Sequence, residues 1–226
     1  MLEHDDEEGT APSEPQTISG LLDDWDITRS ELNEVLADNP SLRGMLFGYV
    51  AEVKARKAVD AFKGVTKTRK EDDHDRDNKH DLVITYKGHE ITLEVKSLQT
   101  NSIKRHEQLD GTVRYTGKSQ VDASDRREIH FSDGTKLNTT LLQYGDFDVL
   151  AVNIFAFEDE WRFIYARNKD LPHSTYHKYT EAQRKALIGS LVPVSWPSAP
   201  PFKQNLKEVL DEIVKERGGP RSASRG

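Results

Sequence analysis

The segment HDLVITYKGHEITLEVKS, residues 80–97, constrains the fold of this 226-residue chain more than any other stretch. Two runs of apolar and β-branched residues flank Lys87-Gly88, which fits the two-residue loop of a tight hairpin. With that loop, Leu82 lies directly opposite Leu93, and opposed residues share a face of the sheet. We therefore predict an antiparallel hairpin whose core face consists of Leu82, Ile84, Tyr86, Ile91, Leu93 and Val95.

The other face of this hairpin gathers three ionisable residues at the end away from the turn. The same pairing places Asp81 opposite Glu94, and Lys96 follows Glu94 on that face. Two facing carboxylates repel each other unless a positive charge lies between them. Mg²⁺ prefers oxygen ligands and takes one or two carboxylates together with substrate phosphate. The pattern therefore predicts a site for phosphodiester hydrolysis, with Asp81 and Glu94 as metal ligands and Lys96 acting on the attacking water or the phosphate.

A salt bridge on a solvent-facing side of the sheet is an alternative explanation of the same three residues. The predicted pairing also depends on the length of the loop, because a three-residue loop would shift the register and separate the faces differently. The pattern alone leaves both interpretations open.

Helical patterns precede the hairpin. Thr28, with Glu31 three positions later, fits the capping box of a first helix that should end at Asn39-Pro40. A longer helix is expected over about 41–62. Its apolar residues keep helical spacing, and Glu52 lies one residue off this stripe. The stripe consists of Leu42, Met45, Leu46, Tyr49, Val50, Val53 and Phe62.

Strands are expected on both sides of the hairpin segment. VTKTRKEDDHDRDNKHD, from residue 65, should begin as a strand and continue as a charged loop, whose His74, Asp75 and Asp77 we leave out of the site. REIHFSDGTKLNTT predicts a hairpin with a primed turn at Asp133-Gly134. FDVLAVNIFAF is typical of a strand buried on both faces, and WRFIYAR of a further strand. An amphipathic helix closes the chain, with Phe202, Leu206, Val209, Leu210 and Ile213 at helical spacing.

An Asp before one strand of a hairpin, followed by Glu94-Val95-Lys96 in the next, resembles the motif of the PD-(D/E)xK nuclease superfamily. That superfamily includes most type II restriction endonucleases, Holliday-junction resolvases and several repair nucleases. The resemblance implies that Asp81 and Glu94 bind metal and that Lys96 is the catalytic lysine. Glu52 resembles the glutamate that many members add to the metal shell. His80 stands where the motif has proline, a position that varies widely.

The resemblance also implies a fold. The expected class is α/β (α+β), with a mixed central sheet flanked by helices in the order αβββαβ. The matching segments would be 41–62, 65–68, 82–87, 90–97 and 147–157. The second core helix is not evident in the sequence, since 99–146 has the pattern of loops and hairpins.

The domain organisation follows from these patterns. Residues 1–18 and 218–226 are rich in polar and charged residues or in Pro, Gly and Ser, and we expect flexible tails there. A single nuclease domain is expected over 19–217. Its core would comprise about 41–98 and 147–167, with an inserted DNA-recognition segment over about 99–146.

Side chains suited to DNA contact lie in the inserted segment. We expect phosphate contacts from Lys104, Arg105, Arg114 and Lys118. Side chains that can contact base edges follow, and a surface loop held by its own turns is the alternative explanation for them. The candidates for base contact are Gln120, Asp122, Ser124, Arg126 and Arg127.

Composition narrows the remaining functions. A net charge of −7 argues against a protein that simply coats nucleic acid, but not against an enzyme that contacts DNA through local patches. The absence of cysteine excludes disulfides and thiolate metal sites. No apolar run is long enough to span a membrane, and the acidic N-terminus is unlike a secretory signal, so we expect a cytoplasmic protein.

The functional expectation is a Mg²⁺-dependent endonuclease, with Mn²⁺ as a substitute, that cleaves double-stranded DNA. A type II restriction enzyme acting as a homodimer is the leading hypothesis, because two-fold protein symmetry matches a palindromic site. The alternatives are a junction resolvase or repair nuclease, an exonuclease, and a DNA-binding protein without catalysis.

Overall fold

The computed structural model describes residues 20–70 and 80–220. Most of the two expected tails and of the charged loop before His80 lie outside these residues. The chain divides into two compact units between Met45 and Leu46. No helix among the described residues is both long enough and apolar enough to cross a membrane.

The first unit contains α1 (Leu21–Asp24), α2 (Arg29–Asp38) and the start of α3 (Pro40–Asp60). The predicted capping box is confirmed: the backbone N–H of Glu31 donates to Thr28 Oγ1 at 3.2 Å, and that of Thr28 donates to Glu31 Oε2 at 2.7 Å. The helix ends before Asn39, as expected. α3 begins at Pro40. Backbone N–H groups in the first turn of a helix have no partner within the helix, and proline has no N–H, so it is favoured at this position.

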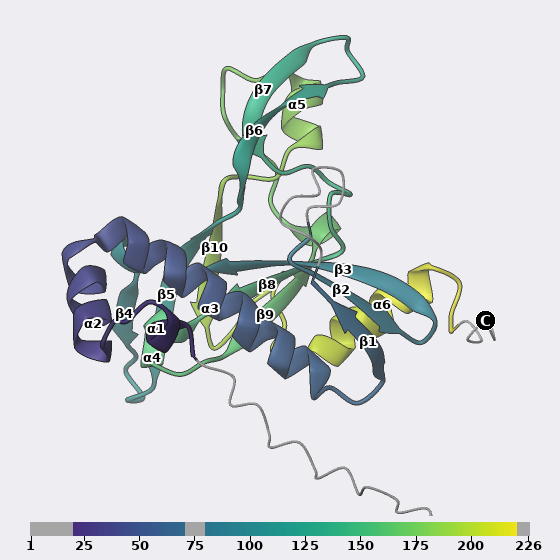
Figure 1. Ribbon diagram of the computed structural model, residues 1–226. Helices are drawn as coiled ribbons and strands as arrows, with labels where there is room; N and C mark the ends of the chain where they lie inside the picture. The colour runs from purple at the N-terminus through teal and green to yellow at the C-terminus, as the bar shows by residue number, and fades with distance from the viewer. Residues whose placement is uncertain (1–19, 71–79, 221–226) are drawn as a thin grey trace, which may run out of the picture. The chain divides into compact units, whose positions relative to one another are not determined.

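A five-stranded mixed sheet lies at the centre of the second unit (Figure 1). The strand order is β1-β2-β3-β8-β9, with β3 and β8 parallel and the other neighbours antiparallel. The β2–β3 hairpin has the predicted register, with Leu82 opposite Leu93. Lys87 and Gly88 both have positive φ, of 48° and 79°, as a primed two-residue turn requires. The strands are β1 (Val65–Arg69), β2 (Leu82–Tyr86), β3 (His89–Ser97), β8 (Val149–Asn153) and β9 (Phe163–Arg167).

One face of this sheet packs against α3 and against α6 (Leu206–Glu216) (Figure 1). The predicted core face of the hairpin is buried there in full. In α3, however, the buried residues are Ala51, Ala55 and Val59, whose small side chains let the helix approach the bulky residues of the sheet. The larger apolar stripe does not form that buried face. Five of its members are exposed: Leu42, Met45, Leu46, Tyr49 and Val53.

A second core lies on the other face of β8. Val149 and Ala151 belong to the first core, whereas Leu150 and Val152 belong to the second, so the expectation of a strand buried on both faces is confirmed. The predicted strand ends at Asn153, and the rest of the apolar run forms the short helix α4 (Phe155–Glu158). A three-stranded antiparallel sheet of order β10-β5-β4 contributes to the second core. Its strands are β4 (Lys104–Glu107), β5 (Val113–Gln120) and β10 (Leu191–Trp196).

A hairpin of β6 (Asp122–His130) and β7 (Lys136–Leu141) shares a small third core with α5 (Glu181–Ala186). The predicted hairpin is therefore present, but its turn differs. The N–H of Phe131 donates to the carbonyl of Thr135, and that of Gly134 to the carbonyl of Phe131. Of the turn dipeptide only Gly134 has positive φ, so this is a three-residue loop and not a two-residue primed turn.

The class is thus mixed α and β, as expected, but one element of the αβββαβ order is missing. Between β3 and β8, where that order places a helix, the described chain forms only the 3₁₀ turn η1 (Thr100–Ser102) and β4 to β7. In this segment β5 and β7 alternate exposed with less exposed residues over most of their length, the period of two that favours a strand.

Candidate active site at the open end of the β2–β3 hairpin

Asp81, Glu94 and Lys96 come together at the end of the hairpin away from its turn. Asp81 directly precedes β2, and its Oδ2 accepts a hydrogen bond of 2.7 Å from the backbone N–H of Val95. This bond crosses from β2 to β3 and fixes Asp81 beside Glu94. The predicted juxtaposition follows from the confirmed register, because Glu94 is the next residue after Leu93, the partner of Leu82.

Lys96 forms an ion pair with Glu94. Its Nζ lies 2.6 Å from Glu94 Oε1, and both side chains are largely withdrawn from solvent, with 22% and 9% of their surface exposed. Alternation along β3 places the two side chains on the same face, and the parallel strand β8 covers the other edge of β3. The salt bridge of the alternative interpretation is therefore present, but it is largely buried and does not lie on a solvent-facing side of the sheet.

Burial and neighbouring carboxylates shift the pKa values of this cluster. Burial, followed by the charge of Asp81, raises the pKa of Glu94 to about 7, although Lys96 opposes the shift. Burial works to lower the pKa of Lys96, but the charges of Glu94, Asp81 and Glu52 outweigh it, and the pKa is raised. Lys96 is therefore protonated and compensates part of the negative charge of the three carboxylates.

Glu52 belongs to the same neighbourhood. A hollow of about 100 Å³ is lined by both Glu52 and Asp81, together with Tyr49, Val53, Arg56, Lys70 and Leu82. Glu52 Oε2 lies 3.2 Å from Lys70 Nζ, and Lys70 also lies over the ring of Tyr49 at 5.5 Å. Of the four predicted site residues, Glu52 on α3 and Asp81 before β2 thus line one hollow, whereas Glu94 and Lys96 do not line it.

Two basic residues beside this hollow were missed. Arg56 follows Glu52 by one helical turn on α3, a spacing that could have drawn attention to it. Lys70 directly follows β1, and its place beside Glu52 depends on how α3 packs on the sheet, which no local pattern reveals.

The donor set fits a hard divalent cation of the Mg²⁺ type. Asp81 and Glu94 supply carboxylate oxygens, and their mutual repulsion would be relieved by a cation between them. Within the described residues, no group of three or more His, Asp or Glu side chains is placed to hold a metal ion, so Glu52 does not join Asp81 and Glu94 in a ready-made set of three ligands. Mg²⁺ does not require this, since it keeps several waters and takes phosphate oxygens of its substrate.

The residues expected to contact DNA fall into separate groups. Lys104, Arg114 and Lys118 line one hollow on the β10-β5-β4 sheet. Arg105 is not with them: it lies opposite Tyr115, on the other face of the sheet, and pairs with Glu107 at 2.9 Å.

The candidates for base contact lie on or next to β6, and most of their side chains bond to other residues of the protein. Gln120 Nε2 donates to Asp122 Oδ2 at 2.8 Å, and Ser190 Oγ donates to the same oxygen. Arg126 donates to the backbone carbonyl of Asn138 at 3.3 Å, and Arg127 pairs with Asp146. Ser124 is exposed on β6.

Comparisons with known proteins add one structural likeness. No protein-family model matches the chain, and no curated protein matches it. The chain is similar to the solved structure of a bacterial homing endonuclease, I-Ssp6803I. The superposition covers 76% of this chain and 94% of the endonuclease, with 14% sequence identity and a TM-score of 0.37. A similarity of that size carries no argument about fold or function.

Proposed function

We propose that this protein is a Mg²⁺-dependent endonuclease that hydrolyses phosphodiester bonds of double-stranded DNA, and that it acts as a type II restriction enzyme in the form of a homodimer. One observation carries the proposal: Asp81, Glu94 and Lys96 converge in a largely buried cluster next to Glu52. The resemblance to the PD-(D/E)xK motif supports the same assignment of roles.

The carboxylates have the first role in this account. Asp81 and Glu94 would hold the divalent ion, and Glu52 would support it from α3. The hydrogen bond from Val95 N–H to Asp81 fixes one ligand in place before any substrate arrives, so little ordering is left to the moment of reaction. Bound Mg²⁺ would supply charge neutralisation at the phosphate and an activated water.

Lys96 has the second role. Its ammonium lies 2.6 Å from Glu94 Oε1 and compensates the charge of that carboxylate. A divalent ion would take over that task and leave the ammonium to contact the phosphate or the attacking water, where it stabilises developing negative charge. A lysine held in this way acts as a cation, because neighbouring carboxylates raise its pKa.

The test uses supercoiled plasmid and phage DNA, with Mg²⁺ or with EDTA, for the parent protein and for Glu94→Ala. We expect discrete fragments that require Mg²⁺, and a loss of about a hundredfold or more in the variant. Cleavage of the circular plasmid separates an endonuclease from an exonuclease. A smear or single-strand nicks under the same controls would replace the restriction enzyme by a repair or structure-selective nuclease.

A DNA-binding protein without catalysis is the competing function. In such a protein the Lys96–Glu94 pair is only a structural ion pair, and we would expect no cleavage with any divalent ion. Absence of cleavage of plasmid, phage DNA and a branched substrate by the folded parent would contradict the nuclease proposal.

A further inference from the structure

The β10-β5-β4 sheet carries its basic residues on one face. Arg114, Thr116 and Lys118 are alternate residues of β5 and share a side, and Lys104 lies directly opposite Thr116. The other side of the sheet belongs to the second core, where Val192 and Val194 of β10 are buried. We call this outward basic face of β4, β5 and β10 the cationic face.

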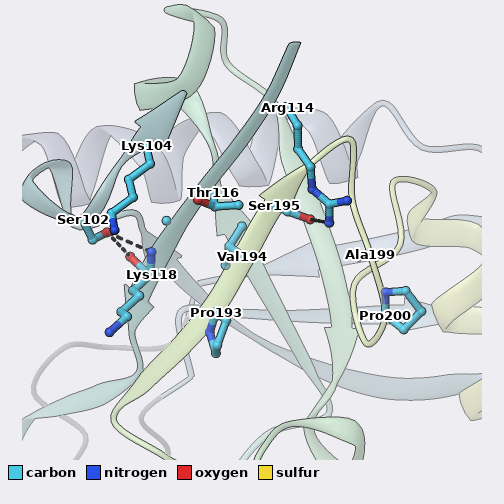
Figure 2. A pocket seen from close by; sticks show the side chains of 11 residues that line it. Ser102, Lys104, Arg114, Thr116, Lys118, Pro193, Val194, Ser195, Ala199 and Pro200 are labelled. Carbon is cyan, nitrogen blue, oxygen red and sulfur yellow. Dashed lines mark hydrogen bonds between the residues drawn. The ribbon is translucent and has the colours of Figure 1, made fainter. Parts of the chain in front are cut away.

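A hollow of about 400 Å³ lies on the cationic face (Figure 2). Lys104, Arg114 and Lys118 line it, all three exposed, and its lining contains no acidic residue. Among the described residues, none of the three takes part in an ion pair, whereas Arg105 on the opposite face is paired with Glu107. In a chain of net charge −7, a surface of this kind is an uncompensated local excess of positive charge.

Hydroxyl groups lie between these cations. Arg114 Nη2 donates to Ser195 Oγ at 3.3 Å, and Figure 2 shows the guanidinium against this hydroxyl. Ser102 Oγ accepts the backbone N–H of Lys118 at 2.8 Å, and Thr116 lies between Arg114 and Lys118. The hydroxyls of Ser102 and Ser195 donate to the carbonyls of Gln99 and Pro197, so the basic side chains are the donors that this surface offers to phosphate.

The cationic face is joined to the strand of the candidate active site. The N–H of Gln99 donates to the carbonyl of Lys118 at 2.9 Å, and Ser119 Oγ donates to the carbonyl of Ser97 at 3.2 Å. Gln99 is three residues beyond Lys96, a path of about 10 Å in extended chain. Two hydrogen bonds thus connect the cationic face to the stretch of chain that directly follows Lys96.

We propose that the cationic face binds the sugar-phosphate backbone of duplex DNA and positions the scissile phosphate at the carboxylate cluster. This inference rests on the proposed function and deepens it. Lys104, Arg114 and Lys118 act on position and affinity and not on sequence, because contacts to phosphate carry no base information. Base contact, if it occurs, belongs to other parts of the chain.

The test measures binding without cleavage. Fluorescein-labelled duplex DNA is titrated with Glu94→Gln protein in Ca²⁺, across about 50 to 200 mM salt, with fluorescence anisotropy as the readout. Lys104→Ala, Arg114→Ala and Lys118→Ala are each added to this background, and Arg105→Ala is the matched control. Arg105 is the neighbour of Lys104 on β4 and carries the same charge, but it lies on the other face. Thermal melts establish that each variant is folded.

Each of the three variants should weaken binding about three- to tenfold and reduce the slope of log affinity against log salt by about 0.9. Arg105→Ala should change the affinity less than about twofold and leave the slope unaltered. Equal effects of Arg105→Ala and Arg114→Ala would overturn the inference, since net charge alone would then explain binding. Unchanged slopes in all three variants would overturn it as well.

The two proposals fail separately in this design. If the three variants lose affinity but the parent cleaves no DNA, the cationic face stands and the nuclease assignment falls. If the parent cleaves DNA and the variants bind as tightly as the background protein, the nuclease assignment stands and the cationic face falls.

Discussion

Two charged regions of this molecule are built in opposite ways. In the carboxylate cluster, Glu94 and Lys96 are 9% and 22% exposed and pair with each other. On the cationic face, Lys104, Arg114 and Lys118 are exposed and line a hollow without acidic residues. Burial raises the free energy of a charged side chain and so shifts its pKa, and catalytic groups often have pKa values shifted in this way. Exposure leaves charge free to attract a polyanion over distances set by salt.

The comparison predicts that removing charge from the carboxylate cluster has the larger effect. Lys96→Met should lower cleavage about a hundredfold or more, because the cation beside the phosphate is lost. It should also lower the free energy of unfolding by about 1–3 kcal/mol at pH 8 in EDTA, since Glu94 and Asp81 lose their compensating charge.

The loss of stability should be smaller at pH 6, where Glu94 can take up a proton. Chemical denaturation at the two pH values measures this difference. Equal losses of stability at both would show that Lys96 contributes packing and not charge compensation. Lys87→Met, which removes the more exposed Lys87–Asp211 ion pair at the hairpin turn, is the control for loss of a paired lysine from the same hairpin.

The next effect concerns Mg²⁺ and pH. Because burial raises the pKa of Glu94 to about 7, the native protein binds more protons than the unfolded chain between pH 4.5, the ordinary pKa, and 7. The contribution of Glu94 to the free energy of unfolding therefore falls as the pH rises through this window. A cation held by Asp81 and Glu94 would remove this penalty and would compete with the proton.

Addition of about 10 mM Mg²⁺ should thus raise Tm by a few degrees at pH 8 and by less at pH 6. Glu94→Gln should abolish this dependence on pH. Differential scanning fluorimetry with Mg²⁺ and EDTA measures both. An identical rise in Tm for the parent and for Glu94→Gln would place the ion elsewhere.

The smallest effect concerns the Ser195 hydroxyl, which accepts a hydrogen bond from Arg114. Ser195→Ala removes the acceptor of a 3.3 Å hydrogen bond but no charge. We expect a loss of DNA affinity of less than about threefold and an unchanged salt slope, because the number of cations at the phosphates is the same. A change in slope would mean that Ser195 determines whether Arg114 reaches the phosphate at all.

The two regions also differ in how far the sequence predicts them. The β2–β3 hairpin is contiguous, and its two-residue turn determines which residues face each other, so the cluster of Asp81, Glu94 and Lys96 could be predicted. The cationic face depends on the pairing of β5 with β10, in which Lys118 lies opposite Pro193. No local pattern predicts a partner that distant. The separation of Arg105 from Lys104 follows from alternation along β4 only once the residues of that strand are known.

The α3 helix shows a different limit. Its large apolar residues suggested a stripe, but Ala51 and Ala55 make the contact with the sheet, because the bulk is already supplied by residues such as Leu82 and Ile84. Which side of a helix is buried depends on the volume that the partner leaves, and this is a property of the packed pair. Glu52 was assigned by resemblance and not by the stripe.

The central claim is that the carboxylate cluster is a catalytic centre, and one matched pair of variants tests it most directly. Glu94→Gln and Glu90→Gln make the same change on the same face of β3, but Glu94 is buried beside Asp81, whereas Glu90 is exposed and pairs with Arg69 at 2.5 Å. Cleavage of supercoiled plasmid in Mg²⁺ should fall about a hundredfold or more in Glu94→Gln and less than about twofold in Glu90→Gln. Equal cleavage by the two variants would contradict the assignment of Glu94 and, with it, the proposed active site.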